Sequence, residues 1–305
     1  MEKVQAREVK YIKLGEGGEW EPECLATGTI RFGYHDTPHQ MCLEGKWEDV
    51  HKVWLPLRNN NPSTATSDVR QIKAFYTATP DIVFITFSQG LMHWCQPCGD
   101  VIELEDGSRM RPTVNGWHSI SLAGHLLSHS FLSGELLATQ NYRGTICDVR
   151  LASYALRKIN DELSPEIIAA DLAEAQYLKA ISGLCSLLTW QDFELLVDLI
   201  FSASGWRRTG ALGRTQKMVD IELELPTTQE RAFVQVKSVA DESVLSEYLS
   251  LFQASHSYSR MFFVWHRGAL REDREHDGVT LIGPNRLAEL IVSTGLTRWL
   301  RDKVS

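Results

Sequence analysis

The chain has 305 residues, of which 43% are hydrophobic and 23% charged, and its formal net charge is −8. This length predicts two domains of ordinary size, and the composition is typical of a globular protein without long disordered tails. The negative charge excludes a generally basic nucleic-acid binder, so any contact with DNA must be local.

The first residues, MEKVQAREVK, are charged where a signal peptide needs an apolar stretch. A run of about 18 apolar residues, the length that crosses a membrane, does not occur anywhere in the sequence. We therefore expect a cytoplasmic protein without membrane contact. The six cysteines of so long a chain are typical of reduced thiols rather than of a disulfide framework.

The sequence pattern of residues 1–150 predicts a β-rich domain, because short runs of alternating apolar and polar residues are separated by Gly, Asn, Pro and Asp. Such runs occur at residues 29–34, 82–87 and 101–104. This half also holds five of the nine tryptophans. Aromatic rings mostly build cores, but they also line pockets that accept a flipped base, and we assign such a base pocket to Trp47, Trp94 and Trp117.

Three segments of this half, Pro80–Phe87, Leu91–Trp94 and Gly116–Trp117, resemble parts of PUA-like barrels, the family of the EVE and YTH domains. The resemblance implies a PUA-like barrel that reads modified bases in DNA. It is confined to these short segments, so core packing of the same aromatic residues stays open as the alternative.

A zinc site is suggested by His93, Cys95 and Cys98, with a residue such as His118 as a fourth ligand. Structural zinc usually needs four ligands, and no second CxxC motif follows. Two buried or incidental thiols are therefore the alternative, and the sequence leaves zinc binding by Cys95 and Cys98 undecided.

Residues 151–182 are rich in Ala, Leu and Glu and are interrupted by Ser164–Pro165, which predicts a linker of two helices. Residues 183–305 then follow the order helix, strand, strand, helix, strand, helix, an α/β arrangement. Thr189 is the expected N-cap of the first of these helices, and Gly205 its end. Its apolar face is expected to consist of Phe193, Leu196, Val197 and Ile200. The whole chain is thus predicted to be a two-domain α+β protein.

A basic segment follows this first helix, because residues 205–219 carry four cations and no acidic residue. The cations are Arg207, Arg208, Arg214 and Lys217. Clustered cations neutralise phosphates, so these residues are candidate DNA contacts. The alternative is a solvated loop with incidental charge.

A hairpin is predicted from two alternating runs, Val219–Leu225 and Arg231–Val239, joined by the turn Pro226–Gln229. If the hairpin is symmetric about its turn, Asp220 lies opposite Gln235. Lys237 shares the polar face of its strand with Gln235, since side chains alternate.

This polar face suits the hydrolysis of a phosphodiester, which needs a cation beside the phosphate and a nucleophilic water. Magnesium prefers oxygen ligands, and Mn²⁺ is expected to substitute for it. We expect Asp220 to bind the ion directly, with further oxygens from the side chain of Gln235 and the backbone carbonyl of Val236. Lys237 would hold the attacking water and oppose the negative charge that develops on the phosphate.

The same region resembles the Mrr-like restriction endonucleases of the PD-(D/E)XK type over residues 188–264, about a quarter of the chain. The elements shared with that family are Asp192-Phe193-Glu194, Gly205-Trp206, the basic loop, Val219-Asp220-Ile221 and Val234-Gln235-Val236-Lys237. The resemblance implies that Glu194 is an auxiliary acid, Asp220 the central ligand, Gln235 the variable ligand and Lys237 the catalytic lysine. It also implies that Gln253, on the helix after the hairpin, approaches the phosphate.

The pattern departs from the family in the loop before Asp220, which lacks the usual small and acidic residues, and in Gln235, a weaker ligand than glutamate. Our hypothesis is a type IV-like, modification-dependent endonuclease that acts on double-stranded DNA. Cutting both strands favours a homodimer or two sequential nicks. The alternatives are a structure-specific repair or junction nuclease, and a DNA-binding protein that has lost its chemistry.

Overall fold

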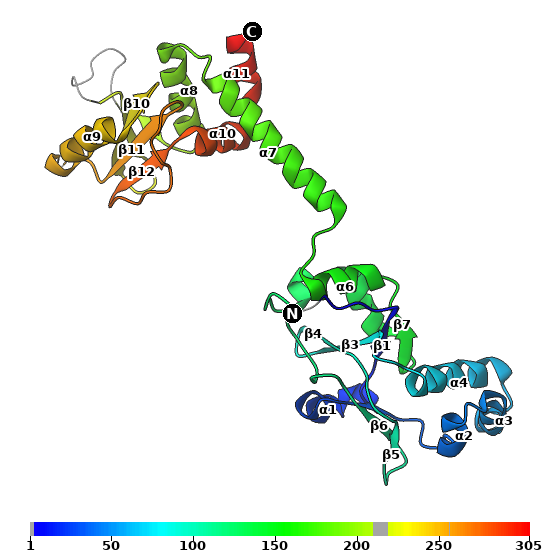
Figure 1. The fold of residues 1–305 in the computed structure, drawn as a ribbon. Coiled ribbons are helices and arrows are strands. Elements are labelled where there is room, and N and C mark those ends of the chain that lie inside the picture. The colour runs from blue at the N-terminus through cyan, green and yellow to red at the C-terminus, as the bar shows by residue number, and fades with distance from the viewer. Residues whose placement is uncertain (1–2, 210–218, 256) are drawn as a thin grey trace. The chain divides into compact units, whose positions relative to one another are not determined.

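The computed structural model describes residues 3–209, 219–255 and 257–305, and the chain in it divides into two compact units, residues 1–164 and 165–305 (Figure 1). The linker expected at residues 151–182 is helical, but its two helices belong to different units. Helix α6 (Ala152–Asn160) buries Ala155 and Ile159 in the first unit, whereas α7 (Pro165–Cys185) buries its last turns in the second.

The first unit is a mixed α/β structure. Its strands are β1 (Glu8–Ile12), β2 (Thr29–Phe32), β3 (Ile82–Ser88), β4 (Leu91–Cys95), β5 (Ile102–Glu103), β6 (Arg109–Pro112) and β7 (Ile146–Asp148). Its other helices are α1 (Glu21–Thr27), α2 (His39–Leu43), α3 (Trp47–Leu57), α4 (Pro62–Tyr76) and α5 (Gly134–Leu137), with short 3₁₀ turns at Glu16–Gly18, His129–Phe131 and Ala138–Asn141. The strands form two sheets, with the orders β4-β3-β1-β7 and β2-β6-β5.

The expectation of a β-rich domain was wrong for residues 39–76, which form α2, α3 and α4. Trp47, Val50 and Trp54 recur at helical spacing, and α4 is capped by Asn61, whose side chain accepts from the amides of Ser63 and Thr64. Buried residues of these helices belong to one apolar cluster with side chains of β1 and β3, and those of α6 belong to another, so the central strands are buried on both sides.

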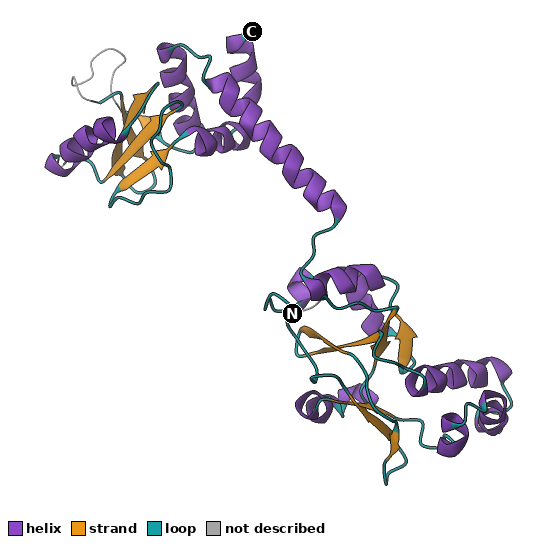
Figure 2. Ribbon diagram, viewed as in Figure 1, coloured by secondary structure: helices purple, strands orange, loops and turns teal. Residues whose placement is uncertain are grey.

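The second unit is a five-stranded sheet between helices (Figure 2). Its strands are β8 (Arg207–Arg208), β9 (Ile221–Leu225), β10 (Glu230–Lys237), β11 (Arg260–Trp265) and β12 (Val279–Ile282), in the order β12-β11-β10-β9-β8. Its helices besides α7 are α8 (Trp190–Ala203), α9 (Glu242–Ala254), α10 (Pro284–Ser293) and α11 (Thr297–Val304). The predicted order of elements is therefore present, with β8 and β12 in addition.

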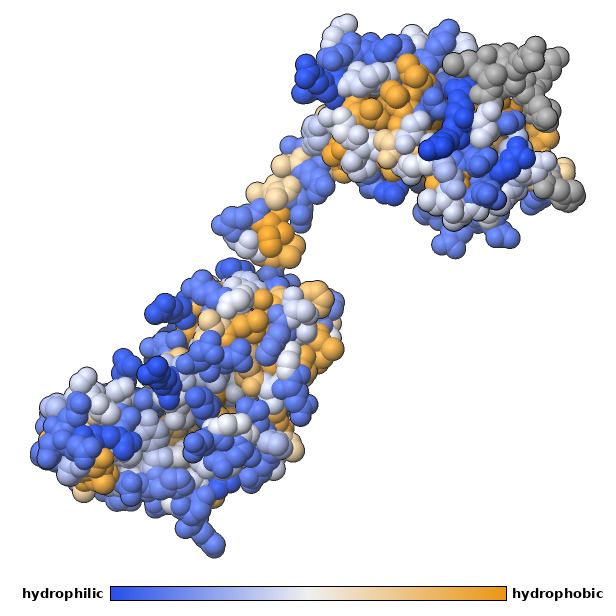
Figure 3. All heavy atoms as spheres, turned by 180° about the vertical axis from the view of Figure 1, so that it is seen from behind, coloured by the Kyte–Doolittle hydropathy of each residue, from blue (hydrophilic) through white to orange (hydrophobic). Residues whose placement is uncertain are grey.

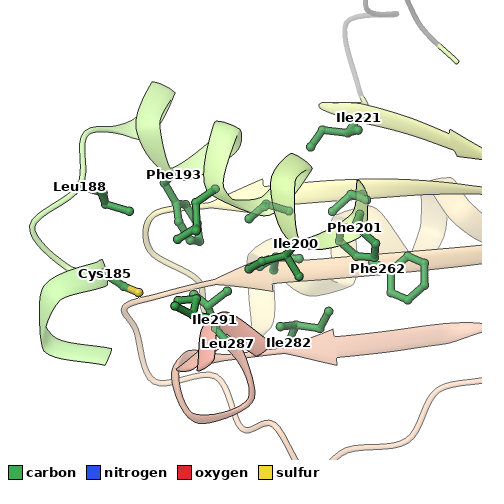
Figure 4. Packing of buried hydrophobic residues seen from close by; sticks show 14 of the residues in the cluster. Cys185, Leu188, Phe193, Ile200, Phe201, Ile221, Phe262, Ile282, Leu287 and Ile291 are labelled. Atoms are coloured by element: carbon green, nitrogen blue, oxygen red, sulfur yellow. The ribbon is translucent and has the colours of Figure 1, made fainter. Parts of the chain in front are cut away.

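Two apolar clusters hold α8 and α9 on opposite faces of this sheet. On one face Phe193 and Ile200 of α8 pack against Ile221 and Phe262 of the strands, together with α10 and the end of α7 (Figure 4). On the other face Leu245 of α9 and Phe233, Phe263 and Trp265 of the strands form the second cluster. The sheet is thereby fixed from both sides, which gives the side chains on its strand ends a rigid support.

The surface is mainly hydrophilic, with separate apolar patches on the face shown in Figure 3. Within the described ranges, no helix combines the length and the apolar character that crossing a membrane requires. The six cysteines are free thiols.

Candidate active site

The predicted hairpin places Asp220 opposite Gln235. Strand β9 pairs with β10 in antiparallel register, with Leu225 opposite Glu230 and Ile221 opposite Val234. One step further along this register lies the pair of Asp220 and Gln235. The predicted pairing is confirmed by a side-chain hydrogen bond, in which Nε2 of Gln235 donates to Oδ2 of Asp220.

The carboxylate of Asp220, the residue before β9, accepts a hydrogen bond from the backbone of β10. The backbone amide of Val236 donates to Oδ2 of Asp220 at 2.7 Å, in the position where a carbonyl of a longer β9 would accept. In a paired strand, the N–H and C=O of one residue point to the same edge. The carbonyl of Val236 therefore lies on the edge that carries Asp220.

Glu194 approaches from the helix on one face of the sheet. It lies in the second turn of α8, beside the buried Phe193, and shares Arg208 with Asp198 of the next helical turn. The guanidinium nitrogens of Arg208 are 3.8 Å from an oxygen of each carboxylate. The sequence analysis did not predict Asp198 as a site residue. Its i, i+4 spacing from Glu194 places both carboxylates on one face of the helix, and this spacing could have identified it.

Lys237 lies at the end of β10, two residues after Gln235 and on the same side of the strand. Its Nζ is 4.9 Å from the centre of the Tyr248 ring of α9, a cation–π contact that holds the side chain near the sheet. Its positive charge acts on Asp220, where it favours the ionised carboxylate. Tyr248 is a second residue that sequence reasoning missed.

The two acids of the site have raised pKa values. Burial is the largest cause for Asp220, and it is opposed by the hydrogen bond from Val236, the charge of Lys237 and the hydrogen bond from Gln235. Burial also raises the pKa of Glu194 most, and the negative charge of Asp220 raises it further against the effect of Arg208. The two carboxylates therefore repel each other when both are ionised, a condition that a bound cation relieves.

The oxygens at this point suit a divalent cation. Gln235 is 1% exposed, and its Oε1 has no hydrogen-bond partner among the described residues. A buried oxygen without a partner costs free energy, and a hard cation would satisfy it. Gln235, the carboxylate of Asp220 and the carbonyl of Val236 thus fit such an ion. Within the described ranges no group of three or more His, Cys, Asp and Glu side chains is placed to hold a metal.

The predicted DNA contacts are only partly placed. Arg207 is exposed on β8, whereas Arg208 is turned toward Glu194 and Asp198. Arg214 and Lys217 lie outside the described residues. Gln253 is exposed on α9 beside Phe252, which contacts Phe233 in the middle of β10. The approach of Gln253 to the phosphate stays a prediction.

The three tryptophans of the predicted base pocket do not converge. Trp47 and Trp117 pack at the margin of one core cluster, and Trp94 belongs to the cluster on the other face of the central sheet. The ring of Trp94 lies 4.7 Å from that of His118, and the indole of Trp117 donates to the carbonyl of Thr29. Trp47 begins helix α3, Trp94 lies on β4 and Trp117 lies in the loop after β6; alternation along β4 turns Trp94 to the face opposite Cys95.

The same alternation separates the zinc candidates. Cys95 is buried in the cluster below one face of β4, whereas His118 stacks on Trp94 at the other face. The four residues therefore do not gather in one ligand set.

Comparison of the chain with protein-family models, with curated proteins and with solved structures yields no match. The functional reading of the site therefore depends on its geometry.

A pH dependence of stability follows from the raised pKa of Glu194. A carboxyl with a raised folded-state pKa stabilises the fold below its ordinary value of 4.5, and this contribution is lost as the pH rises through the folded pKa. Glu194→Gln should avoid this loss. In metal-free buffer, we therefore expect the free energy of unfolding of the variant, relative to that of the wild type, to increase as the pH rises above 4.5. The difference is measured on the second unit alone, by urea unfolding over a pH series followed through the amide hydrogen exchange of α8.

Asp192→Asn is the control of opposite sign in the same helix. Hydrogen bonds from Lys303 and Thr189 lower the pKa of Asp192, so its contribution is present at neutral pH and is lost as the pH falls. A Glu194→Gln difference that stays constant with pH would contradict the assignment.

Proposed function

We propose that the chain is a metal-dependent endonuclease that hydrolyses phosphodiester bonds in DNA. The observation that carries the proposal is the carboxylate of Asp220, bound by Gln235 and Val236 at the end of the β9–β10 pairing. Glu194 and Lys237 lie within electrostatic reach of it. Mg²⁺ or Mn²⁺, when bound there, would supply positive charge beside the phosphate.

The chain's own residues would share the remaining tasks. Lys237, a compact cation, would orient a water for attack and oppose the charge that develops on the phosphate oxygens. Glu194, whose pKa is raised, would exchange a proton with a water closer to neutral pH than an ordinary carboxylate does. Gln235 would hold Asp220 in position through its amide.

Selection of modified DNA and a homodimeric assembly belong to the same proposal. A type IV-like enzyme needs a unit that recognises the modification, and the first unit is the part of the chain that would do so. A duplex has two strands, so two copies related by a twofold axis, or two sequential nicks, would complete the cut.

The test is digestion of matched unmodified and cytosine-modified plasmid DNA by the full chain with Mg²⁺ or Mn²⁺. We expect cleavage that EDTA abolishes and that Asp220→Ala lowers by at least about a hundredfold. Glu224→Ala is the matched control, since Glu224 lies on β9 opposite Arg231 and away from Gln235.

Each outcome decides a different part of the proposal. Cleavage that survives Asp220→Ala would place the chemistry elsewhere. Preference for unmodified branched DNA would replace the modification-dependent enzyme by a structure-specific nuclease. Specific binding without cleavage under any metal would favour a protein that has lost its chemistry.

A further inference from the structure

A large cavity in the first unit has no role in the proposed cleavage. It measures about 830 Å³, within the range of sites that bind small ligands. Four separate stretches of the chain line it: residues 13–20, 33–36, 54–68 and 143–145. Its wall contains three aromatic residues, Trp20, Tyr34 and Trp54.

The wall of the cavity contains a charge-neutral group of polar side chains centred on the buried Asp68. Asp68, which is 8% exposed, accepts from the hydroxyl of Tyr34 at 3.0 Å and from Nε of Arg58 at 2.5 Å. The guanidinium of Arg58 also lies 4.8 Å above the ring of Trp54. Within the described residues the two terminal nitrogens of Arg58 donate no hydrogen bond. Free donors of Arg58 therefore lie close to the acceptor oxygens of Asp68 and Tyr34.

The backbone at Tyr34 is held in a costly conformation. Its φ is +63°, in the left-handed region that non-glycine residues rarely adopt. The ring stacks on Phe32 with centroids 4.8 Å apart, and the hydroxyl is fixed by Asp68. Strain of this kind persists where the surroundings impose it, and it is common at ligand sites.

The charges around the cavity select against a highly charged anion. Arg58 is neutralised by Asp68, and Lys13 donates to the carbonyl of Tyr142 at 3.0 Å. In all, the lining contains four carboxylates, from Glu16, Glu19, Asp36 and Asp68, against the three cations Lys13, Arg58 and Arg143, so four negative and three positive charges leave a net charge of −1. A polyphosphate would meet net repulsion, whereas a neutral planar group would not.

From these features we propose that the cavity binds a single nucleobase. A base is planar and stacks on aromatic side chains, and its edge presents hydrogen-bond donors beside acceptors, which matches the arrangement of Arg58, Asp68 and Tyr34. The base is either part of a free nucleoside or an unpaired residue of a DNA strand whose phosphates stay outside the cavity. The inference is independent of the cleavage chemistry, because it involves none of the residues on β9 and β10.

The test uses the full chain carrying Asp220→Ala, in EDTA, so that DNA is not cut. Calorimetric titrations compare the four deoxynucleosides, a duplex with one unpaired base and the same duplex fully paired. We expect Trp20→Leu to weaken binding by about tenfold or more and Tyr34→Phe by about three- to tenfold. Circular dichroism checks that both variants are folded.

Two variants serve as matched controls, because Trp47 and Tyr76 are half-buried against the same core cluster as Trp20 and Tyr34 but do not line the cavity. Trp47→Leu and Tyr76→Phe should bind within about twofold of the parent. Binding of nucleosides identifies a free ligand, and binding of only the duplex with an unpaired base identifies a strand. The proposal is overturned if no probe binds more tightly than about 1 mM, or if the controls weaken binding as much as the cavity variants.

Discussion

Replacing Lys237 by alanine is expected to lower the rate of DNA cleavage by about a hundred- to a thousandfold, the loss typical of removing one preorganised charge from a reaction centre. Binding of Mn²⁺ should survive, because no expected metal ligand is removed. The measurement is a single-turnover cleavage rate together with a calorimetric Mn²⁺ titration. Asp220→Ala, in contrast, should lose both cleavage and Mn²⁺ binding.

Arg231 is the matched control for Lys237. It also lies on β10, on the same side of the strand, and its guanidinium lies 5.6 Å from the ring of Tyr258, much as Lys237 lies near Tyr248. Arg231→Ala therefore removes a comparable cation and cation–π contact six residues away. We expect it to leave the cleavage rate within about threefold. Equal losses in the two variants would indicate a general effect of charge on DNA binding, not a catalytic lysine.

The second large effect is expected in the core that supports Glu194. Leu196 and Leu195 are consecutive residues of α8, but Leu196 is fully buried against the sheet and Leu195 is 42% exposed. Leu196→Ala should destabilise the second unit by about 2–5 kcal/mol, since it removes apolar burial and leaves a cavity. Leu195→Ala should cost less than about 1 kcal/mol.

Hydrogen exchange of the amides in α8 and β10 measures this pair of variants best, because a chain with two units gives no single unfolding transition. Exchange in the first unit should be unchanged in both variants. If Leu196→Ala left the protection of β10 intact, α8 would not support the strand that carries Gln235 and Lys237.

The hairpin and α8 could be predicted from the sequence because local rules determine them. Strict alternation and a four-residue turn give the register that pairs Asp220 with Gln235. Thr189 caps α8 as predicted, with its side chain accepting from the amide of Asp192. Strands β8 and β12 were missed, since two and four residues carry too little periodicity to stand out.

The rest depends on contacts between distant segments. The cavity in the first unit brings Trp20, Tyr34, Trp54 and Asp68 together from four separate elements or loops, and no spacing in the sequence indicates this. The tryptophan content of the first half predicted a pocket at Trp47, Trp94 and Trp117 instead. These residues lie in clusters on different faces of the central sheet of the first unit. Arg208 was expected to contact DNA because its segment is basic, but the acidic partners on α8 became apparent only in three dimensions.

The hydrogen bond from the amide of Val236 to the carboxylate of Asp220 can form only when the hairpin has its native register. The proposed reaction centre therefore depends on correct folding of the hairpin. A slip of β9 by one residue would turn the aspartate to the opposite face and, at the same time, remove Ile221 and Leu223 from the apolar cluster that they form with α8. A molecule with misaligned strands would then be inert as well as unstable. For the proposed nuclease, newly made or damaged copies would thus cut no DNA until their strands are in register.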